Sequence, residues 1–598
     1  MKNNVTFKLM GTILSFLLMG AYLQAQDLTL PEGMVQLTPT GVEVTNVMPF
    51  ANPASPQALL PVSTDFIIFG ARTAELGAEL WITNKTAQST RLLKDINPGT
   101  NSSNPGGYAL MGGKVYFKAE TPENGAELWV TDGTEAGTKM LVDIYPGVTG
   151  SGPGGLVVLG NKILFTAMDE ESELLPVVDP TKKESWLWVT DGTVEGTVRI
   201  ADVPLNSYIE VCGNKAFFAA TDLTNNMTLW VTDGTKAGTK VLKNINNKPA
   251  TGTFATESAA IGALRNVNDK WVVFRAETVK EQVGEDYGSE IWMSDGTTEG
   301  TKWLGHDFAK GMRSGKPTAT QFAIPVAFGD TLYFRSDDGV HGVEPCVWYM
   351  NQPIVEGVNP RQFFDVNHWG GAVQYDSWPS EFFPYQGYLF MQVNGGYYMP
   401  GDATQYASGY SLWLTPLEER LDTCIYQRQF WGKEIAAGSL TDGCASFTKV
   451  TDKLFFKVLD EANNTELWVV DNISTFPRKV VDLPGNGNPG SFINIDQDLY
   501  FTSYGVKSLF RYNVGSATGT KDVKSLPEVT VYPTNASDRI EIKSAEVVKS
   551  VEIYNVSGQL VMQKSNVTTL DVNTLNGMYL VKVLLANGEQ SIHKISVK

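Results

Sequence analysis

One phrase recurs along the chain and restricts its fold more than any other feature. The clearest copy runs from Glu127 to Thr138 and reads Glu-Leu-Trp-Val-Thr-Asp-Gly-Thr-Glu-Ala-Gly-Thr. Three close copies and several degenerate ones place tryptophans at Trp81, Trp129, Trp188, Trp230, Trp292, Trp348, Trp413 and Trp468. Their mean spacing is about 55 residues, and a repeat of that length is typical of propellers and solenoids.

Each unit has the same internal plan, which predicts four antiparallel strands. In the second unit, residues 108–111 and 114–119 read as strands joined by the tight turn Gly112-Gly113. The phrase supplies a third strand and a turn at Asp132-Gly133, and residues 138–143 supply a fourth strand. Four antiparallel strands per unit make a propeller blade. We therefore predict an all-β propeller over residues 26–526, with about eight blades and with seven or nine as alternatives.

The residues of the phrase are expected to be architectural. A tryptophan can bury a large ring between adjacent units. The aspartate can accept hydrogen bonds from turn amides, the glycine permits a positive φ, and the threonine hydroxyl can cap the turn. The same residues recur in unit after unit, so we do not expect them to be catalytic. The alternative is a set of repeated calcium sites at the aspartates of the phrase, Asp132, Asp191, Asp233 and Asp295.

The phrase resembles the ELWxxDGT repeat family, which is found in exported bacterial proteins and has no defined function. The resemblance covers roughly residues 57–523. The sequence departs from the family pattern at Asn84, where the first copy lacks Asp-Gly-Thr, and again between His341 and Asp471. These departures are the reason why the number of blades is not fixed by the pattern alone.

The N-terminus reads as a secretory signal peptide over residues 1–25. Lys2 and Lys8 form a positive region, an apolar run extends from Leu9 to Leu23, and Ala25 is a small residue at the expected cleavage site. The run is short for a membrane span, and no other segment is a candidate for one. We therefore expect no transmembrane segment in the mature chain.

The C-terminal residues 527–598 have a different pattern. Seven short apolar runs separated by turns predict a small immunoglobulin-like β-sandwich. This stretch resembles the type A sorting domain of the type IX secretion system in Tyr532, Pro533, Gly558, Leu575, Gly577 and Tyr579. Thr534-Asn535 stands where the family usually has Asn-Pro. The resemblance implies that the type IX machinery is a partner. It also implies passage through the periplasm and across the outer membrane, followed by release or attachment at the cell surface.

Charge and cysteine content exclude some partners and metals. The formal net charge is -18, which argues against nucleic acid and anionic lipid as partners. The four cysteines have no zinc-binding spacing. Cys424 and Cys444 are the closest pair and are candidates for a disulfide, whereas four buried thiols are the alternative; the other two are Cys212 and Cys346. No cofactor is predicted, with calcium as the exception named above.

Enzymatic motifs do not stand out in this sequence. The 4 histidines form no paired metal motif, and we find no nucleophile elbow, P-loop or dinucleotide fingerprint. We therefore predict that the protein is not an enzyme. The alternative is a propeller enzyme acting on glycans, for example a sialidase-like one.

An aromatic-rich segment, residues 363–431, departs most from the repeat. Its glycine pairs indicate loops, and loops on a rigid scaffold often carry binding sites. Exposed aromatic rings can stack on sugars or anchor a protein partner. We therefore predict that a glycan or protein ligand binds at Trp369, Tyr375, Trp378, Tyr397 and Tyr398. Together these features predict a secreted or surface-attached propeller that binds a ligand.

Overall fold

The computed structural model describes most of the chain, in segments. The described residues are 30–45, 59–61, 66–170, 185–205, 207–221, 227–243, 245, 261–277, 289–303, 326–337, 343–353, 361–362, 380–394, 397–399, 402–407, 410–417, 444–459, 465–473, 477–481, 483, 487–514, 529–532, 535–544, 546–555, 560–586 and 590–597.

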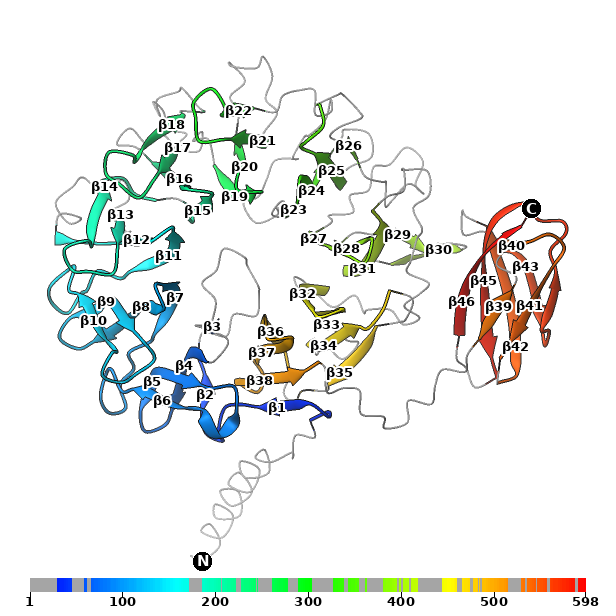
Figure 1. Ribbon diagram of the computed structural model, residues 1–598, viewed down its shortest axis with the longest axis horizontal. Coiled ribbons are helices and arrows are strands. Elements are labelled where there is room, and N and C mark those ends of the chain that lie inside the picture. The colour runs from blue at the N-terminus through cyan, green and yellow to red at the C-terminus, as the bar shows by residue number, and fades with distance from the viewer. Residues whose placement is uncertain are drawn as a thin grey trace, which may run out of the picture.

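Successive antiparallel sheets stand side by side in a ring, and we number these blades along the chain (Figure 1). Blade 1 contains β2 (Glu43–Val44), β3 (Leu59–Pro61), β4 (Ile67–Thr73), β5 (Gly77–Thr83), the short 3-10 helix η1 (Ala87–Ser89) and β6 (Arg91–Lys94). Blades 2 and 3 contain β7 (Gly106–Met111), β8 (Lys114–Thr121), β9 (Gly125–Thr131) and β10 (Lys139–Val142), then β11 (Gly154–Leu159), β12 (Lys162–Ala167), β13 (Trp186–Thr190) and β14 (Val198–Ala201). Blades 4 and 5 contain β15 (Glu210–Cys212), β16 (Lys215–Thr221), β17 (Met227–Thr232) and β18 (Lys240–Lys243), then β19 (Gly262–Val267), β20 (Trp271–Glu277), β21 (Ser289–Ser294) and β22 (Lys302–Trp303).

The remaining blades vary more. Blade 6 contains β23 (Val326–Phe328), β24 (Thr331–Asp337), β25 (Val343–Tyr349) and β26 (Arg361–Gln362). Blade 7 has the three strands β27 (Ser380–Tyr385), β28 (Tyr388–Asn394) and β31 (Tyr410–Pro416), with the separate hairpin β29 (Tyr397–Met399) and β30 (Asp402–Ala407) inserted between the last two. Blade 8 contains β32 (Cys444–Val450), β33 (Lys453–Leu459), β34 (Thr465–Val470) and β35 (Arg478–Val481).

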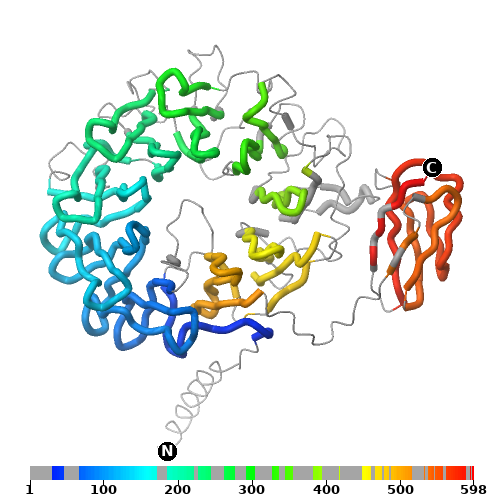
Figure 2. Tube along the Cα trace, viewed as in Figure 1, coloured from blue at the N-terminus to red at the C-terminus, as the bar shows by residue number. Residues whose placement is uncertain are grey.

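Blade 9 is completed by the two ends of the propeller sequence. It contains β36 (Pro489–Ile495), β37 (Asp498–Ser503) and β38 (Ser508–Asn513), and β1 (Met34–Gln36) pairs antiparallel with β38 as the fourth strand. Figure 2 shows this junction, where the blue start of the chain meets the orange end of the ring. The ring is therefore closed by main-chain hydrogen bonds between residues more than 400 positions apart, such as the amide of Leu37 and the carbonyl of Leu509.

The all-β propeller followed by a small β-sandwich is confirmed. Within the described residues nine sheets of three to five strands stand in the ring, apart from the two-stranded hairpin β29–β30, and this number corresponds to the alternative of nine units. The difference from the expected eight arises from blade 9, whose copy of the phrase has Phe510 in place of tryptophan and Ser508 in place of glutamate. The pattern marks Leu509-Phe510 only as a possible degenerate copy, which is why nine units stand as an alternative.

Neighbouring blades are held together by apolar side chains. Each of the nine contacts around the ring contains a cluster of buried residues from both blades. Between blades 1 and 2, for example, Ile68 and Leu80 pack with Phe117 and Trp129. In the described ring every contact between neighbouring blades contains such a cluster, and the junction of blades 9 and 1 is no exception.

The repeat tryptophan has a fixed cross-strand partner. Trp129 on β9 lies opposite Phe117 on β8 and is only 7% exposed. A phenylalanine takes the same position opposite Trp81, Trp188, Trp230, Trp292 and Trp468. Trp413 lies opposite Met391, and its side chain is outside the described part of the structure.

In blade 6 the predicted repeat tryptophan, Trp348, is not in the position of the repeat tryptophan. Its buried Glu344 lies in the place of the repeat glutamate, which puts Cys346, opposite Phe334, in the register of the repeat tryptophan. Trp348 lies two residues further along β25 and pairs with Leu332. The sequence reads Glu-Pro-Cys-Val-Trp here, so searching for the nearest tryptophan selected the wrong position.

The C-terminal domain is a two-sheet sandwich. One sheet has the order β39 (Thr530–Tyr532), β41 (Arg539–Lys543), β44 (Thr569–Asp571). The other has the order β40 (Asn535–Ala536), β46 (Gln590–Val597), β45 (Gly577–Leu585), β42 (Val548–Asn555), β43 (Leu560–Ser565). Valine, isoleucine and leucine side chains from both sheets form a separate core, which includes Val551, Ile540 and Ile595.

Replacing Trp129 with alanine tests the role of the repeat tryptophan. The substitution should lower the free energy of unfolding by about 3–5 kcal/mol, because it leaves a large cavity between blades 1 and 2. Urea unfolding of the full chain measures this change, and Trp129→Phe is the control that keeps most of the buried area. An alanine variant with unchanged stability would contradict a core role for this residue.

Candidate functional site

The Asp-Gly-Thr turns join the third and fourth strands of their blades. In blade 2, Oδ1 of Asp132 accepts hydrogen bonds from the amide and the hydroxyl of Thr134, at 2.9 and 2.6 Å. The Thr131 and Thr138 hydroxyls lie 2.7 Å apart, and Gly133 has a φ of 87°. The same aspartate–threonine contacts recur at Asp191, Asp233 and Asp295. Hydrogen bonds from the hydroxyl and amide of the threonine two residues further along lower the pKa of Asp132, Asp191 and Asp233. At Asp295 burial acts in the opposite direction, but the same hydrogen bonds still lower the pKa.

A second glycine of the phrase is required for a steric reason that the sequence did not reveal. A Cβ added to Gly137 would lie 2.0 Å from Oδ1 of Asp132. The equivalent distances are 2.0 Å at Gly196, 2.1 Å at Gly238 and 2.0 Å at Gly300. The aspartate carboxylate therefore folds over the second glycine, and the two residues depend on each other.

The glutamate of the phrase also has a role that sequence reasoning missed. Glu127 is fully buried and accepts hydrogen bonds from the amides of Ile144, Tyr145 and Ser151 and from the Ser151 hydroxyl. Glu79 binds the loop after β6 in the same way, through Ile96 and Ser103. Burial raises the pKa of both carboxyls in spite of these bonds. The repeat glutamate thus fixes the connection to the next blade.

Each Asp-Gly-Thr turn also packs against the preceding blade. The first and third turns of a blade lie on the same face of the ring, because its strands are antiparallel; we call this the turn face. There, Gly192 lies against the hydroxyl end of Tyr116 in blade 2, and the Lys162 ammonium of blade 3 donates to the carbonyl of Gly234 at 2.8 Å. The Lys215 ammonium of blade 4 donates to the carbonyl of Asp295 in blade 5 at 3.1 Å.

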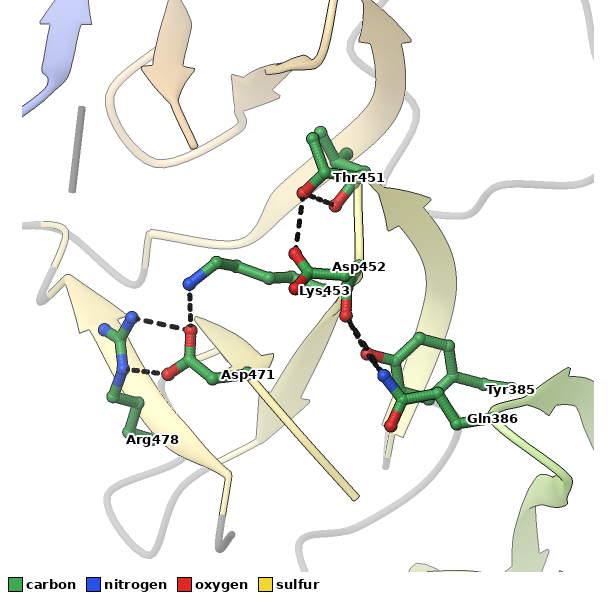
Figure 3. A network of polar contacts seen from close by, with 8 residues as sticks. Tyr385, Gln386, Thr451, Asp452, Lys453, Asp471 and Arg478 are labelled. Atoms are coloured by element: carbon green, nitrogen blue, oxygen red, sulfur yellow. Dashed lines mark hydrogen bonds and ion pairs between the residues drawn. The ribbon is translucent and has the colours of Figure 1, made fainter. Parts of the chain in front are cut away.

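Blades 7 and 8 use a different set of contacts on the turn face (Figure 3). Asp471 occupies the aspartate position of blade 8, where it binds Lys453 at 2.6 Å and Arg478 at 2.6 Å. Its pKa is lowered because the hydrogen bonds and charges of these two cations outweigh its burial. From blade 7, Gln386 bonds to the Ile473 amide, and the Tyr385 hydroxyl donates to the carbonyl of Asp452. The contacts of Tyr385 and Gln386 with Asp452 and Ile473 join the two blades, and the Asp471 ion pairs lie beside them within blade 8.

The first copy of the phrase keeps the turn but changes its chemistry. Thr83 and Thr90 retain the hydroxyl contact, at 2.8 Å. Ser89 takes the place of the second glycine, and its hydroxyl oxygen accepts from the Thr86 amide and hydroxyl at 3.3 and 2.9 Å. These are the groups that the aspartate binds in the other blades. Asn84, in the aspartate position, makes no hydrogen bond through its side chain to the described residues, and Lys85, in the first glycine position, has a φ of 67°.

A polar pocket lies beside this turn, at the junction of blades 9 and 1, which we call the seam. It has a volume of about 420 Å³ and is lined by Asn84, Lys85, Thr86, Asp496, Gln497, Asp498, Tyr500, Arg511 and Asn513. Lys85 pairs with Asp496 at 2.6 Å, and Nε of Arg511 pairs with Asp498 at 2.7 Å. Tyr500 is fully buried, and its hydroxyl has no hydrogen-bond partner among the described residues. Burial raises the pKa of Tyr500 to about 12, so the hydroxyl stays protonated at neutral pH.

The predicted aromatic ligand surface is left untested. Trp369, Tyr375 and Trp378 lie outside the described residues, and Tyr397 and Tyr398 are placed only as main chain in β29. Cys424 is also outside them, so its pairing with Cys444 stays a prediction, whereas Cys212 and Cys346 are buried.

In the sorting-domain motif, Pro533 and Gly558 are not described. Leu575 and Tyr579 pack against the sandwich core, Gly577 begins β45, and Tyr532 donates to Glu541 at 2.8 Å.

No group of three or more histidine, cysteine, aspartate or glutamate side chains is arranged to hold a metal ion in the part of the chain that the structure covers. Likewise, none of the described helices is long and apolar enough to cross a membrane.

The dependence of Asp132 on Gly137 can be measured with a double-mutant cycle. Gly137→Ser alone should lower the free energy of unfolding by about 1–3 kcal/mol, since its Cβ collides with the carboxylate. Combined with Asp132→Asn it reproduces the pair found at Asn84 and Ser89, so the double variant should be clearly less destabilised than the sum of the single changes. Strict additivity in urea unfolding would show that the two positions are independent.

Acid should weaken the Asp-Gly-Thr turns. Their aspartates have lower pKa values in the folded than in the unfolded chain, so their stabilising effect is complete above about pH 4 and is lost as the pH falls further. Changing all four to asparagine (Asp132, Asp191, Asp233 and Asp295) should make the loss of stability below about pH 4 shallower. Urea midpoints measured across this range test it, and parallel profiles for the two proteins would contradict the assignment.

Comparison with known proteins identifies one part of the chain. Residues 530–598 match the secretion-system C-terminal sorting domain. No curated protein matches the chain.

Among solved structures, similarity is low. One of two prolyl endopeptidases analysed for inter-domain dynamics has 11% identity and a TM-score of 0.34, covering 81% of this chain and 53% of that one. A puromycin hydrolase has 11% identity and a TM-score of 0.32, covering 71% and 62%. The β-propeller domain of the Trilobed protease from Pyrococcus furiosus has 12% identity and a TM-score of 0.27, covering 63% and 97%. The chain thus spans about half of the length of the prolyl endopeptidase and about six tenths of the length of the puromycin hydrolase. The comparisons identify residues 530–598, which follow the propeller, as a match to the secretion-system C-terminal sorting domain.

Proposed function

We propose that the protein is an exported binding protein whose propeller engages a ligand outside the cell and has no catalytic activity of its own. The observation that carries this proposal is the repetition of the Asp-Gly-Thr turn. Its aspartate, threonines and glycines bind one another in the same way in four blades, so the most prominent polar residues of the sequence already have structural partners.

The C-terminal domain supports the exported location. A sorting domain of the type IX kind implies handling by that secretion machinery and delivery to the medium or the outer surface of the outer membrane. A rigid ring of blades suits such a location, because loops and turns on a rigid scaffold can present a binding surface while the core keeps its shape.

Binding and catalysis can be separated in one experiment on the exported chain. The purified protein is applied to arrays of glycans and extracellular host proteins, and the same glycans and proline-containing peptides are analysed for cleavage after prolonged incubation. Saturable binding without turnover is the expected result. Cleavage that persists through purification, and that is lost on substitution of a propeller acid, would replace this proposal with a propeller enzyme acting on glycans or peptides.

Removing the tail tests the export part of the proposal. A chain that ends before Pro527 should fold normally, because the sandwich core is separate from the clusters between blades, but it should accumulate in the periplasm. Cell fractionation measures its location, and thermal unfolding monitored by circular dichroism measures its folding. Normal amounts of the folded truncated chain at the surface would contradict the role of the tail.

A further inference from the structure

The seam differs at several positions from the contacts that the Asp-Gly-Thr turns of blades 2 to 5 make on the turn face. In blades 2 to 5 the third turn carries Asp and Gly and its first glycine lies against the preceding blade, as Gly192 does against the Tyr116 hydroxyl. At the seam, three positions of the phrase change together, to Asn84, Lys85 and Ser89. Tyr500 of blade 9 occupies the position that Tyr116 has in blade 2, since each precedes the phenylalanine opposite the third strand.

The three changes have one combined effect. Because Ser89 accepts the threonine hydrogen bonds, the turn no longer needs a carboxylate, and the side chain at Asn84 is released from the turn. Lys85 adds a cation where the other turns have glycine, at the cost of a positive φ that lysine rarely adopts. Both side chains line the pocket.

The opposite wall of the pocket is the first turn of blade 9, which has non-glycine residues with positive φ, as the first turn of blade 5 has at Asn268 and Asp269. In blade 9 these residues are Asp496 and Gln497, with φ of 51° and 70°. In blade 2 the corresponding turn is Gly112-Gly113, which adopts such angles without strain. The two strained residues of blade 9 present a carboxylate and an amide to the pocket.

The charges of the pocket indicate what kind of ligand it suits. Lys85 is paired with Asp496 and Arg511 with Asp498, so the two cations and two anions balance. A strongly charged ligand would have to break one of these pairs. The remaining groups are amides and hydroxyls, namely Asn84, Thr86, Gln497, Asn513 and the Tyr500 hydroxyl at the buried wall. Such groups both donate and accept hydrogen bonds, which matches a neutral ligand rich in hydroxyls.

We propose that the seam pocket is a binding site for a neutral saccharide. The paired charges have oxygen lone pairs and N–H groups beyond those that join them, and these can bond sugar hydroxyls while the ion pairs stay intact. The volume of about 420 Å³ admits one or two sugar rings. The site deepens the proposed function and rests on it, because it names the chemistry of the ligand that the exported propeller binds.

The test uses the full mature chain and a defined set of probes. Glucose, galactose, mannose, N-acetylglucosamine and their common disaccharides are the neutral probes, and glucuronate, sialic acid and inorganic phosphate are the charged ones. Binding is measured by saturation-transfer NMR and calorimetry. At least one neutral saccharide should bind more tightly than its charged counterpart. Binding of charged probes alone, or of no saccharide, would overturn the inference.

The decisive variant restores the repeat sequence at the seam. Asn84→Asp, Lys85→Gly and Ser89→Gly together recreate the turn of four other blades, so the variant should fold with an unchanged or higher melting temperature. Saccharide binding should fall at least tenfold. Asp233→Asn, in an intact turn away from the seam, is the control for effects of turn chemistry and should bind as the wild type does. Unchanged binding by the restored variant would overturn the site.

A second matched pair examines the buried wall. Tyr500→Phe removes the unpaired hydroxyl and should weaken saccharide binding at least threefold without lowering the melting temperature, whereas Tyr116→Phe should leave binding unchanged. Equal effects of the two substitutions would contradict the assignment of the site to the seam. If the chain binds a protein but no saccharide, this inference fails while the proposed function stands. If the chain cleaves the saccharide, the proposed function fails and these variants still decide whether the seam holds it.

Discussion

The structure depends on the apolar contact between neighbouring blades. A single four-stranded sheet has two apolar faces, and in this ring each face is covered only by the next blade. The cluster that contains Phe117 and Trp129 is one of nine, and each buries side chains from both of its blades. Burial of apolar area is the main source of stability in such a fold, and an open end would leave one face in water. The ring therefore has to close, and β1 closes it by pairing with β38.

The polar residues of the repeat also help to hold neighbouring blades together. The buried Glu127 fixes the loop that leads to the next blade, and the Asp132 turn rests on the preceding one. The two residues thus set how a blade sits between its neighbours, which explains why they recur. Where the phrase changes without loss of the turn, as at Asn84 and Ser89, the change releases side chains from this task. Such a position is where a propeller built from repeats can acquire a binding site.

The sequence was sufficient to predict the four-strand blade, the propeller and the sandwich, because alternating apolar residues and Asp-Gly turns are local signals. It was not sufficient to predict the number of blades, since Phe510 replaces the tryptophan by which units were recognised. It also could not reveal the collision between Gly137 and Asp132, or the burial of Glu127, because both depend on how the turn and the loop fold back. The seam pocket joins Lys85 to Arg511, residues that only ring closure brings together, so no local pattern points to it.

Closure of the ring is the central claim, and amide hydrogen exchange of the intact chain tests it most directly. If β1 completes blade 9, the amides of β37 and β38 should be protected to within about tenfold of those in β8 and β9, because both blades then open only with the ring as a whole. The amide of Leu37, which bonds to Leu509, should share this protection. Exchange in β38 and at Leu37 that is faster by a thousandfold or more than in β9, on the order expected for local opening, would show that the ring is open at the seam.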